Sequence, residues 1–386
     1  MNSPYTGRPP RSFWRSGVSE AHPLTIEDLY RKKFSIGKKD KIATAGSCFA
    51  QHVSNYLQNN RFCVLDVEPP PPVLSEDVAK SFGYKIYSAR YGNIYTIRQL
   101  LQLAQDAEEG RVNATDVWEK DGRYFDALRP NIEPQGFDSV EETLALRKYH
   151  LAKVKELFTQ MDVFIFTLGL TEAWIDTRND RVFPTAPGTI AGEYDPEIHA
   201  FRNFGYNEIY DDFIAFLDLV RDWNPDFKVI LTVSPVPLTA TESDDHVLLA
   251  TTYSKSVLRS VAGELARKHD FIDYFPSYEL IASPWSKGFF YDANMRSVNM
   301  GGVASVMRIF FDEHSKTRGS GVDAADGDRL ARRLRGKTQS AEGEQDESRR
   351  SRRKKRRKKK RASSADAPKS AEDVICEELL LEAFAP

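Results

Sequence analysis

The sequence has little cysteine and no long apolar run, and each shortage excludes a class of protein. Its three cysteines, Cys48, Cys63 and Cys376, cannot build a disulfide framework and lack the paired spacing of a zinc site. The longest apolar run, 163–170, is far too short to span a bilayer, and residues 1–20 hold no apolar stretch typical of a signal peptide. We therefore expect a cytoplasmic protein without a structural metal.

The near balance of charge conceals a basic tail on an acidic body. The 386 residues include 54 Lys and Arg against 56 Asp and Glu, which gives a net charge of −2. Residues 349–361, RRSRRKKRRKKKR, hold 12 of the basic residues and no acid, so the rest of the chain carries −14. Such a run either binds a polyanion, a nucleic acid or an anionic membrane, or is a solvated tail. It has no aromatic residue for stacking on bases, so any binding to nucleic acid would lack sequence preference.

Apolar strands alternate with amphipathic helices from residue 41 to 314. We predict strands at 41–45, 62–67, 162–170, 228–235 and 271–277, and helices at 48–59, 97–107, 138–160, 207–222, 246–268 and 302–314. This order indicates a parallel sheet between helices, in a three-layer α/β/α domain. Ligands of such sheets bind at the carboxyl ends of the strands. Ser47, Thr171 and Pro235 each follow a strand, so we expect them to share one cleft.

The segments outside this domain differ in composition. Residues 1–40 are rich in proline and charge, and we predict an arm across the domain surface with one helix near 25–33. Residues 315–371 have few large apolar side chains, which predicts disorder. The final stretch, 372–386, has apolar residues at helical spacing among acids, which indicates a short amphipathic helix that binds something. Within the domain, we expect 112–135 to be irregular.

The stretch 42-IATAGSCFAQHV-53 places Ser47 and Cys48 on the turn between a strand and a helix. Ser47 is either a nucleophile or the cap of the helix that follows, and its position fits both. Cys48 is either a thiol activated at a helix N-terminus or a small buried apolar residue. Nothing near it in the sequence supplies a base.

The residues GSCFA at 46–50 are the signature that names the GSCFA family. Further blocks that are similar to the family follow in order: 92-GNIYT-96, 167-TLGLTEAW-174, 232-TVSPVP-237, 253-YSKSVLR-259 and 276-PSYE-279. The chain is identified as a member over roughly residues 35–315. The family resembles the SGNH or GDSL hydrolases, which implies a flavodoxin-like α/β/α domain and agrees with the pattern of strands and helices. The bacterial associations of the family weigh against a nuclear role for the basic run.

The resemblance implies a serine ester hydrolase or O-acyl transferase that needs no cofactor. Its substrates would be O-acylated carbohydrates or other small acyl esters. Ser47 matches the nucleophile, and the amides of Ser47, Cys48 and Gly92 match donors to the oxyanion. Thr171 stands where these hydrolases have an asparagine, and Glu172 replaces the aspartate of the same block.

The D-x-x-H block of these hydrolases, which supplies the base, is not matched. Its two positions hold Asn294 and Ser297, and neither residue replaces a carboxylate or an imidazole. His246, at the start of a predicted helix, is our first candidate for the base, and a solvated histidine is the alternative. Ser254-Lys255 resembles a Ser-Lys dyad, but adjacent residues on a helix point in different directions.

Arg296, in the same unmatched block, permits two interpretations. It either holds an anionic substrate, with Glu172 tuning the cleft, or pairs with Glu172 to fix two loops. The missing D-x-x-H pair also supports a rival function: a catalytically inactive binding protein that keeps the fold, the cleft and a polyanion-binding tail.

Overall fold

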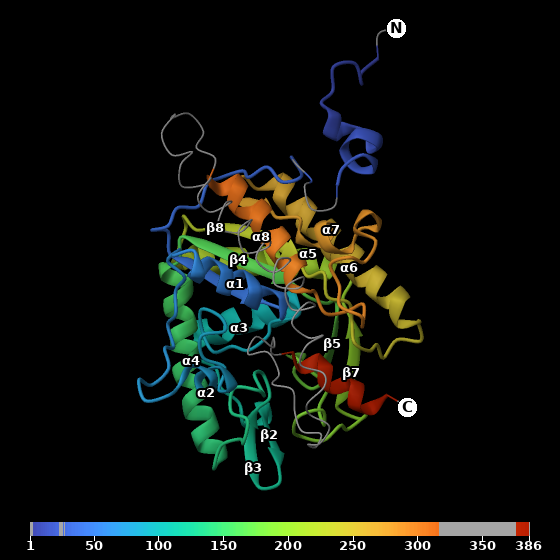
Figure 1. The fold of residues 1–386 in the computed structure, drawn as a ribbon. Helices are drawn as coiled ribbons and strands as arrows, with labels where there is room; N and C mark the ends of the chain where they lie inside the picture. The colour runs from blue at the N-terminus through green and yellow to red at the C-terminus, as the bar shows by residue number, and fades with distance from the viewer. Residues whose placement is uncertain (1–2, 23–25, 27, 316–375, 386) are drawn as a thin grey trace, which may run out of the picture.

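A four-stranded parallel sheet forms the centre of the computed structural model, which describes residues 3–22, 26, 28–315 and 376–385 (Figure 1). Its strands are β1 (Ile42–Gly46), β4 (Val163–Leu168), β8 (Lys228–Val233) and β9 (Ile272–Tyr274), in the order β1-β4-β8-β9. Every residue of β1 and β4 is buried, which explains why their sequences are continuously apolar rather than alternating. The parallel sheet and its order along the chain confirm the predicted α/β class.

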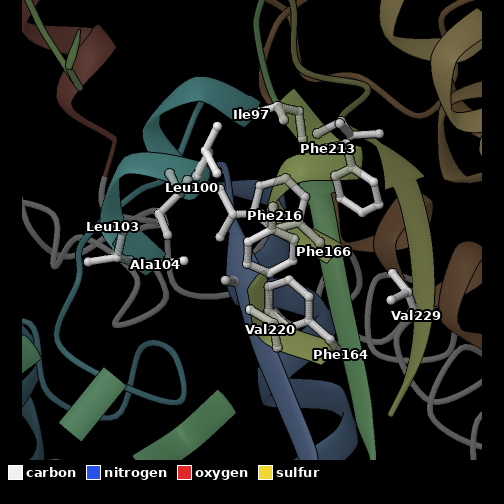
Figure 2. Packing of buried hydrophobic residues seen from close by; sticks show 14 of the residues in the cluster. Ile97, Leu100, Leu103, Ala104, Phe164, Phe166, Phe213, Phe216, Val220 and Val229 are labelled. Carbon is white, nitrogen blue, oxygen red and sulfur yellow. The ribbon is translucent and has the colours of Figure 1, made fainter. Parts of the chain in front are cut away.

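Helices cover both faces of this sheet. One face packs against α3 (Ile97–Glu109), α4 (Val140–Gln160), α5 (Tyr206–Trp223) and α6 (Val247–Lys268). The other packs against α1 (Phe49–Asn59), α7 (Ser277–Ala282) and α8 (Met300–Ser315). Figure 2 shows the first interface, where Phe164 and Phe166 of β4 meet Phe216 of α5. The alternation of side chains along each strand therefore divides one buried sheet between two apolar cores.

Local signals set the ends of these helices. Ser139 begins α4 by accepting a hydrogen bond from the amide of Glu142, and Thr96 caps α3 in the same way. Gly110 ends α3 with a φ of 64°, in the left-handed conformation that glycine adopts without strain. The predicted helices therefore agree with the observed ones to within a few residues.

Smaller elements differ from the predictions. Residues 62–67 form no strand, because only Val64 bridges to Ile42 on the outer edge of β1. The stretch 112–135 is less irregular than predicted, because β2 (Val117–Lys120) and β3 (Arg123–Asp126) form a hairpin there. The smaller parts also include α2 (Glu76–Ser81) and an antiparallel sheet in the order β6-β5-β7. Its strands are β5 (Glu172–Asp176), β6 (Arg181–Phe183) and β7 (His199–Asn203).

The described residues before β1 are not helical over 28–33, so the helix predicted near 25–33 is wrong for that stretch. Instead, Ile26, Tyr30 and Ile36 are buried in the core against α8. The Tyr30 hydroxyl donates a hydrogen bond to the carboxylate of Asp273, 2.9 Å away. The prediction for 315–371 lies outside the described residues except at Ser315, which ends α8, and the basic run 349–361 lies wholly outside them.

No helix among the described residues is long and apolar enough to cross a membrane. Nor does any group of three or more His, Cys, Asp and Glu in that part of the chain have the geometry to hold a metal ion.

Candidate functional site

Ser47 lies at the carboxyl end of β1, in the turn that leads into α1. Its amide donates to the Thr167 carbonyl oxygen at 3.1 Å, and its own carbonyl accepts from the amide of Ala50. Its hydroxyl is buried and makes no hydrogen bond to any described residue. Cys48 is the N-cap residue, and no side chain caps the helix, so Ser47 is not the cap of α1. A buried hydroxyl without a hydrogen-bond partner lowers the stability of the folded state, so its presence calls for an explanation such as a functional role.

Two glycines, Gly46 and Gly169, allow the backbone beside Ser47 to pack more closely than a residue with a Cβ atom could. Gly46 has a φ of 133°, and a Cβ atom there would lie 2.3 Å from the carbonyl oxygen of Thr167. A Cβ atom on Gly169, just past the end of β4, would lie 2.9 Å from the Cβ of Ser47 and 3.0 Å from the carbonyl oxygen of Tyr95. The glycines of the GSCFA and TLGL blocks therefore bring Ser47 against the chain that leaves β4.

Of the four predicted oxyanion donors, one already donates a hydrogen bond within the described chain and three do not. The Ser47 amide is already bonded to Thr167, which corrects its assignment as a free donor. Among the described residues, no hydrogen bond uses the amide of Cys48 or Gly92 as donor. The Thr171 hydroxyl is also buried without a partner, while the amide of the same residue bonds to Ser254. These donors remain available to a ligand.

Lys255, on α6, extends its side chain to Gly169, the glycine that also lies against Ser47. Its side chain is buried, and its Nζ donates to the carbonyl oxygen of Gly169 at 2.7 Å. Ser47 and Lys255 thus both meet Gly169, one at its Cα and one at its carbonyl. Burial lowers the pKa of Lys255 to about 8, although the nearby Glu378 and Cys48 raise it in part. The amine is therefore partly neutral near neutral pH.

The thiol of Cys48 is not activated. Its interaction with the thiol of Cys376 and its burial both raise its pKa well above the ordinary value. The partner thiol shows the opposite effect: the same interaction, together with the guanidinium of Arg296, lowers the pKa of Cys376 to about 6, although burial opposes the shift. The interpretation of Cys48 as a buried thiol fits this arrangement.

Residues Cys376–Ala385 lie across this end of the sheet, as Figure 1 shows for the red segment beside β5 and β7. Residues 377–384 form a 3₁₀-helix, where the sequence predicted a short amphipathic helix. Residues 372–375 of that prediction lie outside the described chain. The carboxylate of Glu377 accepts from the hydroxyl of Tyr95 at 2.7 Å and from the side-chain amide of Asn93. Neither Tyr95 nor Asn93 was among the site residues predicted from the sequence.

Arg296 binds the second carboxylate of this segment. Its guanidinium donates to Glu378 at 3.0 Å, with both side chains about nine-tenths buried. Burial raises the pKa of Glu378 to about 8, and Arg296 opposes this shift. The predicted pair between Arg296 and Glu172 does not form, because Glu172 accepts a hydrogen bond from Thr241 instead.

Asn294 and Ser297 do not enter the cleft. Asn294 is exposed, and its side chain bonds to the Ser297 hydroxyl at 2.9 Å and to the amides of Arg296 and Ser297. They form a turn that presents Arg296.

His246 does not reach Ser47. It is exposed at the N-cap of α6, where its Nδ1 accepts from the amide of Leu248. Lys255 lies nine positions further along α6, or about 13.5 Å along the helix axis. All seven histidines lie in the described part of the chain, and none bonds to the hydroxyl of Ser47. The interpretation of His246 as a helix-start residue describes this position.

A pocket of about 450 Å³ adjoins this cluster. Most of its wall is apolar or aromatic, from β5, β7 and the loops beside them, and it includes Trp174, Tyr194 and Phe201. Glu172 and Thr241 supply polar groups on one side. Glu378, Leu381 and Phe384 of the C-terminal segment complete the lining, so the pocket and the cluster around Ser47 share one boundary.

The sequence model of the GSCFA family matches residues 41–310, more than half of the chain. The chain belongs to the GSCFA family. No match to it is found among curated proteins. The GSCFA blocks quoted from the sequence meet at one edge of the sheet, because Ser47, Thr171 and Lys255 come from three of them.

Proposed function

We propose that the protein is a serine ester hydrolase or O-acyl transferase of the SGNH type. The observation that carries this proposal is the hydroxyl of Ser47, buried and without a partner at the carboxyl end of a parallel sheet. Sheet topology adds support. The segment at Val64 hydrogen-bonds to the free edge of β1, so its addition gives the order 2-1-3-4-5 of flavodoxin-like sheets.

Lys255 serves as the general base in this proposal, in place of the absent histidine. A lysine must be neutral to accept a proton, and burial brings the pKa of Lys255 down to about 8. Ser254, its neighbour in the sequence, is not the nucleophile, because its hydroxyl accepts from the amide of Thr171. In this proposal Lys255 therefore acts with Ser47, which follows β1, and not with Ser254, its neighbour on α6.

The proposed reaction requires Lys255 Nζ, which bonds to the Gly169 carbonyl oxygen in this structure, to turn to the hydroxyl of Ser47. Ser47 Oγ attacks the ester carbonyl carbon as Lys255 accepts the hydroxyl proton. The amides of Cys48 and Gly92 and the hydroxyl of Thr171 donate to the oxyanion that forms. Collapse of this intermediate breaks the bond to the alcohol, which leaves with the proton from Lys255. Water then releases the acid from Ser47, or a second alcohol takes the acyl group.

The adjoining pocket supports a small acylated carbohydrate as the substrate class. Its volume of about 450 Å³ suits a ligand of one or two rings. The aromatic rings of Trp174, Tyr194 and Phe201 give flat apolar faces, while Glu172 and Thr241 offer polar groups to hydroxyls.

A binding protein without catalysis is the second candidate. The observation that favours it is that the cleft already holds carboxylates, from Glu377 and Glu378, on Tyr95 and Arg296. In this alternative the cleft binds a glycan or acyl group, and the basic run 349–361 binds a polyanion.

Labelling of the full chain with a fluorophosphonate probe separates the two candidates. The enzyme reaction requires labelling that disappears in Ser47→Ala and persists in Ser54→Ala, a control at a buried serine of α1. Absence of labelling in the folded and reduced wild-type protein would refute the enzyme and leave the binding protein.

A further inference from the structure

The C-terminal segment Cys376–Ala385 contacts groups to which the proposed function assigns substrate binding. Glu377 lies beside Gly92, with its Oε1 3.8 Å from where a Cβ atom of that glycine would be. Glu378 accepts a hydrogen bond from Arg296, a cationic group that an anionic ligand at this edge could use. Glu377 and Glu378 therefore contact Gly92 and Arg296, two residues that a bound ligand would otherwise contact.

The apolar side chains of the C-terminal segment lie against the apolar wall of the adjoining pocket. Leu381 and Phe384 line the pocket of about 450 Å³ together with aromatic residues of β5 and β7. Neither side chain belongs to the apolar cores that flank the central sheet. The segment is thus docked onto a finished fold rather than built into it.

A third contact joins the first residue of the segment to the signature motif itself. The thiols of Cys376 and of Cys48, the residue after Ser47, lie close enough for each to shift the pKa of the other. The Cys376 thiol lies 3.8 Å from the hydroxyl of Tyr95 and 3.8 Å from the guanidinium of Arg296. Cys63, the remaining cysteine, is exposed and belongs to no such cluster.

We propose that Cys376–Ala385 is a built-in ligand of the Ser47 cleft, and that a disulfide between Cys48 and Cys376 fixes it there and closes the site. The closing of the site to substrate rests on the proposed hydrolase or transferase function. The docking of the segment and the disulfide do not depend on it.

The disulfide forms by exchange with a small-molecule disulfide such as oxidised glutathione. The low pKa of Cys376 makes it a thiolate near neutral pH, so it attacks first and releases one glutathione. Cys48 then loses its proton, attacks the mixed disulfide at Cys376 and releases a second glutathione. Two protein thiols are oxidised and one glutathione disulfide is reduced to two thiols. A reducing thiol reverses both steps and lets the segment leave.

Disulfide mapping tests the docking and the bond without any assay of activity. The full chain is incubated with oxidised glutathione, its free thiols are alkylated, and its peptides are identified by mass spectrometry. We expect a linked peptide that joins Cys48 to Cys376, while Cys63 is alkylated or carries glutathione. Quantitative alkylation of Cys48, at the rate of Cys63 and without a linked peptide, would overturn the proposal.

Labelling of the oxidised and reduced proteins then tests closure. We expect oxidation to reduce fluorophosphonate labelling at least tenfold in the wild type and in the control Cys63→Ser. It should leave Cys376→Ser unaffected. Equal labelling of a fully disulfide-linked and a reduced protein would refute closure. If no form labels, the enzyme function fails, and the linked peptide alone decides whether the segment is docked.

Discussion

Replacement of Lys255 by methionine tests the proposed base most directly. Methionine keeps much of the length and volume of the side chain but has no amine to accept the proton of Ser47. Loss of a positioned base typically slows a reaction by roughly a hundred- to ten-thousand-fold. Labelling of Lys255→Met should therefore fall by at least about a hundredfold, and Lys268→Met, an exposed position on the same helix, should match the wild type.

The structure also predicts how labelling depends on pH. With a pKa of about 8, Lys255 is a neutral amine in only about one-tenth of molecules at pH 7. The labelling rate of the wild type should rise about tenfold from pH 7 to a plateau above pH 9, with its midpoint near 8. The residual rate of Lys255→Met should lack this rise.

The stability of Lys255→Met separates a catalytic effect from a folding defect. The substitution removes the hydrogen bond to Gly169, which costs about 1 kcal/mol, but also removes the cost of burying an amine. The two effects oppose each other, so the melting temperature should change by only a few degrees. Unchanged labelling and an unchanged pH profile in a folded Lys255→Met protein would refute the assignment of the base.

Three further predictions follow from neighbouring contacts. Gly169→Ala should reduce labelling more than tenfold, because its Cβ atom would press on Ser47, whereas Gly110→Ala, with no atom within 4 Å, should only lower the melting temperature by a few degrees. Glu378→Ala should increase labelling of the reduced full chain several-fold, because the C-terminal segment loses its contact with Arg296, and an unchanged rate would count against that contact. Thr171→Val should slow labelling about tenfold or more without reducing the melting temperature, because it removes a hydroxyl that no protein group uses.

Strand and helix periodicity predicted the central sheet because burial imposes it directly. The continuous apolar run of β4 reflects a strand covered on both faces, and the caps at Thr96 and Ser139 act within a single turn. The hairpin of β2 and β3 was missed because its strands carry charged residues, such as Glu119 and Arg123, that give no apolar alternation.

The site was predicted only where a residue sits at the end of a strand. Ser47 and Thr171 were found in this way, because the ends of parallel strands meet at one edge. Lys255 was rejected as half of an adjacent dyad, since sequence spacing does not show which distant turn its side chain reaches. Its place in one of the quoted family blocks was the available signal. The contacts of Glu377 and Glu378 join residues about 280 and 80 positions apart, which no local pattern encodes.

The buried residues before β1 show that the folded unit is longer than the stretch matched by the family model. The family match begins at residue 41, yet Ile26, Tyr30 and Ile36 are less than a tenth exposed against the sheet and α8. Each contributes about 1.5–3 kcal/mol by burial. A chain begun at residue 41 would lose several kilocalories of stability and expose an apolar face prone to aggregation. Any preparation of this protein for biochemistry therefore needs the chain from Ile26 onward.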